Sequence, residues 1–94
     1  MKKLRTSIYS AEQVWLRELF ILQRNKLGLS QRELAKKMNV VYSLISKIET
    51  GDRRLDILEF IQYCQALELD PNNVLQQLIL IQQKQPTTIL PNYL

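Results

Sequence analysis

Four side chains with hydrogen-bonding or aromatic groups fall on one face of a short amphipathic segment near the middle of the chain. They are Tyr42, Ser43, Ser46 and Lys47. A lysine can donate to O6 or N7 of guanine, a serine can pair with several base edges, and a tyrosine ring can pack on a thymine methyl group. Ile45 and Ile48 give the same segment a separate apolar stripe, so packing does not need the polar face. The pattern favours a helix that contacts base edges in the major groove of DNA.

Two short helices joined by a tight turn are predicted for residues 30–51. Ser30 and Glu33 have the spacing of a capping box at the start of the first helix. The apolar side chains of that helix are Leu34, Ala35 and Met38. Asn39 falls where the helix must end, and asparagine tolerates the left-handed backbone of a sharp turn. Gly51 is a typical stop for the second helix, so the stretch predicts a helix-turn-helix.

Residues 16–75 resemble the bacterial and phage Cro/repressor helix-turn-helix family of the xenobiotic-response-element type. The resemblance is carried by Arg24, Gly28-Leu29-Ser30-Gln31, Glu33-Leu34-Ala35, Ile45-Ser46-Lys47-Ile48-Glu49, Gly51, Leu67, Leu69 and Leu75. It implies an all-α fold, a five-helix repressor-like DNA-binding domain with the helix-turn-helix at helices 2 and 3 and a short C-terminal extension.

The resemblance also implies roles for residues outside the polar face. Phosphate contacts are implied for four residues, namely Gln31, Thr50, Arg53 and Arg54. Such contacts position a protein on DNA without reading its sequence. Arg24 and Glu49 match the positions of a buried ion pair that ties the first helix to the recognition helix, so we expect them to orient that helix.

The chain departs from the family pattern at two positions of the recognition helix. Val41 stands where a capping serine or threonine is usual, and Leu44 replaces a residue that is more often polar or aromatic. The groove-facing chemistry is therefore sparse, and we expect DNA shape to supply part of the specificity.

Composition excludes several classes of function. The 94 residues contain no histidine and a single cysteine, Cys64, so a zinc site and the usual Cys–His or Ser–His–Asp catalytic units cannot be assembled. We expect no enzyme activity, no metal and no cofactor. A lone cysteine fits a reducing cytoplasm. No apolar run is long enough to span a bilayer, and no apolar segment follows the basic residues Lys2, Lys3 and Arg5 to make a signal peptide.

Charge divides the chain into a basic and an acidic part. Residues 1–29 carry six basic and two acidic side chains. Residues 30–54 carry six basic and three acidic side chains. Residues 55–94 carry one basic and four acidic side chains, a net charge of −3 within a total of +4. The basic part coincides with the predicted helix-turn-helix, where a polyanion would bind.

The domain organisation follows from the remaining helix signals. We predict a flexible basic arm over 1–9, the helix-turn-helix domain over 10–84 and a tail over 85–94. The first helix should run from Ser10 to about Lys26, and its apolar residues surround it almost completely. The last helix should start at Asp70-Pro71. Its predicted inward residues are Val74, Leu75, Leu78 and Ile79.

Apolar residues that a monomer would leave exposed predict a homodimer. The predicted interface comprises Leu80, Ile89, Leu90 and Tyr93. The sequence thus indicates a cytoplasmic, sequence-specific DNA-binding transcriptional regulator, repressor-like and homodimeric. Its sub-class stays open between phage-type repressor, antitoxin and restriction–modification controller. The alternative is a protein-interaction module, such as an antitoxin whose C-terminal region binds a toxin.

Overall fold

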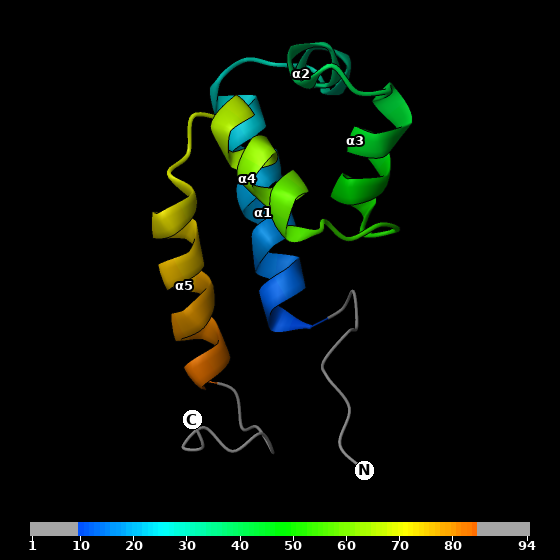
Figure 1. Cartoon of the computed structure of the whole chain (residues 1–94). Coiled ribbons are helices and arrows are strands. Elements are labelled where there is room, and N and C mark those ends of the chain that lie inside the picture. Colours follow the sequence, from blue (N-terminus) through cyan, green and yellow to red (C-terminus); the bar gives the residue numbers. More distant parts are fainter. Residues whose placement is uncertain (1–9, 85–94) are drawn as a thin grey trace.

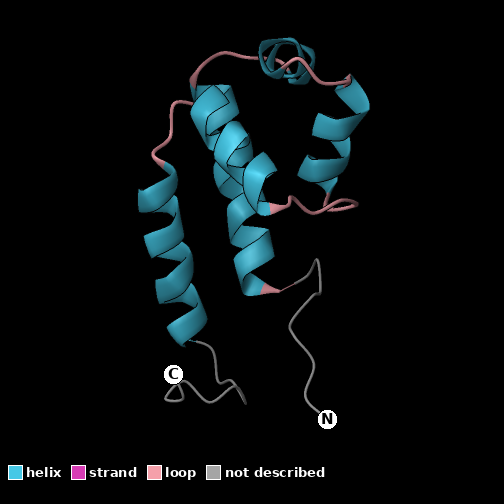
Figure 2. Ribbon diagram, viewed as in Figure 1, coloured by secondary structure: helices cyan, strands magenta, loops and turns pink. Residues whose placement is uncertain are grey.

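Five α-helices and short connections make up the part of the chain that the computed structural model describes, residues 10–84 (Figures 1 and 2). The helices are α1 (Ala11–Lys26), α2 (Gln31–Met38), α3 (Tyr42–Thr50), α4 (Ile57–Ala66) and α5 (Pro71–Lys84). The all-α, five-helix prediction is confirmed. The predicted arm and tail, with the interface residues Ile89, Leu90 and Tyr93, lie outside the described residues.

Local capping chemistry sets several of the helix boundaries. Ser30 accepts a hydrogen bond from the Glu33 amide at 3.0 Å, and the Glu33 carboxylate accepts one from the Ser30 amide at 2.7 Å. A second reciprocal pair, Asp56 and Glu59, starts α4 with distances of 2.8 and 3.0 Å. Capping boxes of this kind satisfy amides that have no partner within the helix. Asn39 ends α2 with φ 58°, the left-handed conformation that the sharp turn requires.

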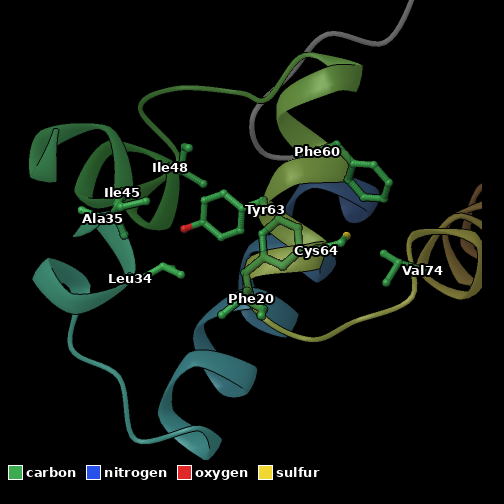
Figure 3. Packing of buried hydrophobic residues seen from close by; sticks show 10 residues of the cluster. Phe20, Leu34, Ala35, Ile45, Ile48, Phe60, Tyr63, Cys64 and Val74 are labelled. Atoms are coloured by element: carbon green, nitrogen blue, oxygen red, sulfur yellow. The ribbon is translucent and has the colours of Figure 1, made fainter. Parts of the chain in front are cut away.

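The core lies where α1 and α4 meet the α2–α3 pair (Figure 3). Its buried members are Phe20, Leu34, Ala35, Ile45, Ile48, Phe60, Tyr63, Cys64, Leu67 and Val74. The rings of Phe20 and Tyr63 stack with centroids 4.5 Å apart, which joins α1 to α4. Burial raises the pKa of the Cys64 thiol to about 11, so this cysteine behaves as a small buried hydrophobic residue.

Helix α5 flanks α1 and α4 on the side away from α3 (Figure 1). Val74 is buried and Leu78 is half-buried, so one face of α5 packs inward. The prediction that Leu75 and Ile79 also point inward is wrong, because both are exposed. Each lies one residue, or about 100° of helix rotation, beyond an inward residue, and within residues 10–84 the main neighbours of α5 are α1 and α4. Leu80 is exposed as well, and so is Leu22 of α1.

Candidate nucleic-acid interface

Helix α3 presents two chemically different faces. Ile45 and Ile48 are fully buried against the core and fix the rotation of the helix about its axis. Of the four residues predicted to contact bases, Ser43 and Lys47 are exposed, Tyr42 is 39% exposed and Ser46 is half-buried. The structure therefore brings all four to one helix, with three of them open to solvent.

The start of α3 lacks the usual side-chain cap. Val41 occupies the N-cap position in extended backbone conformation, makes no side-chain cap hydrogen bond and is 69% exposed. An exposed apolar residue at this end of the helix is suited to contact with a thymine methyl group. Leu44, the second departure from the family pattern, is half-buried and packs against the core.

The turn between α2 and α3 is tight because a small residue lies at their contact. Ala35 is buried there, and its carbonyl accepts a hydrogen bond from the Val40 amide at 3.0 Å. Asn39 supplies the left-handed residue between them. A larger side chain at position 35 would force the two helices apart.

A buried ion pair holds α3 against α1. Arg24 Nε lies 2.6 Å from Glu49 Oε2, and Arg24 Nη2 lies 3.0 Å from Glu49 Oε1, a two-pronged contact. Only 12% of the arginine side chain and 5% of the glutamate side chain are exposed. Arg24 also donates to the Leu29 carbonyl at 2.8 Å, so the pair links the recognition helix to α1 and to the α1–α2 connection.

Gln31, predicted to contact a phosphate, belongs to the same network. Its side-chain Nε2 donates to Glu49 Oε1 at 2.8 Å, so its amide group also supports the position of the glutamate. The backbone of Gln31 lies at the first position of α2, where helix amides point outward and favour anions.

The other predicted phosphate contacts are Thr50, the last residue of α3, and Arg53 and Arg54 in the loop that follows it. Arg53 donates to both carboxylate oxygens of Glu59 at 2.9 and 2.7 Å. The Thr50 hydroxyl lies 3.0 Å from Asp52 Oδ2. Hydrogen bonds from Arg53 and from the Asp56 amide lower the pKa of Glu59. Arg54 is exposed beside them.

Tyr63 places a polar atom in the centre of the core. Its hydroxyl is buried without a hydrogen-bond partner among the described residues, and it points toward the side of the core formed by α2 and α3 (Figure 3). Burial, helped by the negative charge of Glu49 and opposed by Arg24, raises the pKa of Tyr63. The hydroxyl thus stays neutral beside the ion pair.

A stacked pair that periodicity did not indicate joins the two helices of the motif. The guanidinium carbon of Arg32, on the first turn of α2, lies 4.1 Å from the centroid of the Tyr42 ring. The two residues are ten positions apart and face each other only because of the sharp turn at Asn39. The sequence signal for this pair is an arginine near the start of the first helix of the motif and an aromatic residue at the start of the second helix.

Comparison with known proteins agrees with this geometry. A family model described as helix-turn-helix, of the Cro/C1 type, matches residues 21–73, more than half of the chain. This chain belongs to the Cro/C1-type XRE helix-turn-helix family. A solved structure described as an XRE-family like protein from Pseudomonas syringae pv. tomato str. DC3000 is similar to it, with 34% sequence identity and a TM-score of 0.71. The similarity covers 79% of this chain and 90% of that one. No curated protein matches.

Membership of the XRE family makes the protein a DNA-binding regulator. Helix-turn-helix DNA-binding proteins of this family are typically not enzymes. Within residues 10–84 no group of three or more acidic, cysteine or histidine side chains could hold a metal ion. None of the helices in this range is both long and apolar enough to cross a membrane.

Proposed function

We propose that this XRE-family chain is a sequence-specific, repressor-like transcriptional regulator that binds double-stranded DNA as a homodimer. The observation that carries the proposal is that α3 has one buried apolar face and one exposed polar face. Ile45 and Ile48 bury one face completely, and the Arg24–Glu49 pair fixes the helix from behind. On the opposite, polar face Tyr42, Ser43 and Lys47 remain open to solvent, and the face is held at a defined angle, as a base-reading helix requires.

Base contacts are proposed for the four residues on that face. Lys47 donates to O6 or N7 of guanine, Ser43 and Ser46 pair with base edges, and the exposed part of the Tyr42 ring packs on a thymine methyl group. The low hydrogen-bonding capacity of this set leaves part of the specificity to DNA shape.

Phosphate contacts are proposed on both sides of the recognition helix. The Gln31 amide at the start of α2 donates to one phosphate, while Thr50, Arg53 and Arg54 clamp the next. Thr50 and Arg53 would exchange their carboxylate partners, Asp52 and Glu59, for the phosphate. The net charge of +3 over residues 30–54, against −3 over residues 55–94, favours this end of the molecule for a polyanion.

The direct test is selection of bound sites from random duplex DNA, followed by affinity measurements on the selected site and on a scrambled one. Lys47→Ala should lose about 1–3 kcal/mol on the selected site and much less on the scrambled site. Lys84→Ala removes an exposed lysine at the far end of α5 and is the matched control. Equal losses by Lys47→Ala on both duplexes would show that Lys47 contacts a phosphate instead.

Dimerisation is proposed through the C-terminal part of the chain. Leu80 is exposed on α5, and Ile89, Leu90 and Tyr93 follow it in the sequence. A single small domain makes few contacts with DNA, whereas two recognition helices about 34 Å apart would contact two half-sites. Leu80→Asp should shift the protein toward monomer in sedimentation velocity, while Gln77→Asp, with the same charge on an exposed polar position of α5, should not. A monomer at tens of micromolar for the unmodified chain contradicts a preformed dimer.

A protein-binding module, such as an antitoxin that binds a toxin through its C-terminal region, is the second candidate. The observation that favours it is apolar surface on the side of the molecule away from α3. Leu75, Ile79 and Leu80 are exposed there, and a pocket of about 300 Å³ lies between α1, α4 and α5. Binding to heparin or DNA that weakens steeply with salt supports the regulator, and salt-insensitive behaviour supports the module alone.

A further inference from the structure

Arg32 is a cation on the outer surface of the motif with an aromatic partner in place of a carboxylate. Its guanidinium carbon lies 4.1 Å above the ring of Tyr42. Arg24 and Arg53, by contrast, are each held by both oxygens of a glutamate. Among the described residues, no carboxylate lies within ion-pair distance of Arg32, and its side chain is exposed. Its positive charge is therefore available to a ligand.

The stack positions this charge without occupying its donors. An aromatic ring attracts a guanidinium through the electrons of its face and accepts none of the five N–H groups in the usual sense. An unrestrained arginine loses side-chain freedom when it binds, whereas one held on a ring has already lost part of it. Arg32 thus combines free donors with a restricted position.

The position of the stack indicates the ligand. Tyr42 is the first residue of α3, and the N-terminal residues of a recognition helix are those that approach base edges. Val41, beside it, is exposed and apolar, so this end of α3 offers contacts to a thymine methyl group as well as a cation. The planar pair of acceptors that an arginine fork fits best in the major groove is O6 and N7 of guanine.

We infer that Arg32, held on the Tyr42 ring, contacts a guanine in the major groove, so that α2 contributes to sequence reading together with α3. The inference rests on the proposed function, because it assumes that α3 lies in the groove. It assigns to the half-site one guanine whose selection depends on Arg32 and a neighbouring position that depends on Val41 and Tyr42.

The test is selection from random duplex DNA with the full chain and three variants. Arg32→Lys keeps the charge but removes the planar fork, Arg32→Ala removes both, and Tyr42→Phe keeps the ring that supports the stack. Both Arg32 variants should lose the preference for one guanine and retain the rest of the selected sequence. Arg32→Ala should bind the original site about 5- to 150-fold more weakly, the discrimination of one bidentate base contact, and Tyr42→Phe should keep the guanine.

Two results would overturn the inference while leaving the proposed function intact. The first is that Arg32→Ala selects the same sequence and weakens selected and scrambled duplexes equally, with a salt slope smaller by about one, which identifies a phosphate contact. The second is that Arg32→Ala changes neither sequence nor affinity, which makes the stack a link between α2 and α3. If the unmodified chain selects no sequence at all, the proposed function itself fails, and the inference fails with it.

Discussion

Replacing Arg24 by alanine tests whether the ion pair holds the recognition helix in place. The change removes two hydrogen bonds to Glu49, at 2.6 and 3.0 Å, and one to the Leu29 carbonyl, at 2.8 Å. Among the described residues, the Glu49 side chain, only 5% exposed, would keep the hydrogen bond from the Gln31 side-chain amide at 2.8 Å. A carboxylate in this position has too little contact with water to replace the lost arginine.

The expected loss of stability is therefore that of a broken buried ion pair, about 3–5 kcal/mol. A small domain has about 5–15 kcal/mol in total, so the variant should be near the limit of folding at 25 °C. Arg53 offers a matched control, because it makes the same two-pronged contact with Glu59 while 39% of its side chain is exposed. Arg53→Ala should lose at most about 1 kcal/mol, the usual contribution of a surface pair.

Urea unfolding followed by far-ultraviolet circular dichroism measures both variants on the same scale. Arg24→Ala should have a much lower midpoint than Arg53→Ala, and low temperature or a stabilising salt should help to recover its folded state. A loss below about 1 kcal/mol for Arg24→Ala, or equal losses for the two variants, would refute the view that this pair orients α3.

Three further changes probe the core, the end of α3 and acid stability. Tyr63→Phe should leave the urea midpoint unchanged or raise it slightly, because it removes a buried hydroxyl that has no partner among the described residues. Gly51→Ala should lower the free energy of unfolding by about 1–2 kcal/mol, since φ is 87° and a Cβ would lie 2.9 Å from Arg17 Cζ. The lowered pKa of Glu59 adds stability above its unfolded pKa, about 4.3, and this is lost as pH falls through the folded value. Glu59→Gln should therefore weaken the acid dependence of the unfolding temperature below about pH 4.5.

Sequence patterns predicted most of the fold because its boundaries depend on local chemistry. The Ser30–Glu33 and Asp56–Glu59 capping boxes and the left-handed Asn39 act within a few residues, so spacing alone reveals them. The pairing of Arg24 with Glu49, 25 positions apart, came from the family resemblance, and their close contact agrees with it. The DNA contacts and the dimer remain predictions.

Periodicity failed where an outcome depends on how helices pack together. Leu75 and Ile79 fit an apolar face, but within residues 10–84 α5 packs mainly against α1 and α4, and both side chains stay exposed. The resemblance indicated that Arg53 contacts a phosphate, and it gave no sign that Glu59 lies within 2.7 Å of it. Arg32 and Tyr42 likewise meet only because a sharp turn brings the starts of two helices together. Such contacts depend on the angles between helices, which spacing along one chain does not define.

The central claim is that the exposed face of α3 lies against DNA. The most direct test is the change in backbone amide NMR signals of the full, isotope-labelled chain as the selected duplex is added. We expect the largest changes at residues 31–33 and 41–54, with smaller ones along residues 71–84. Unchanged signals over residues 42–47 at saturating DNA, with the largest changes on α5, would contradict it.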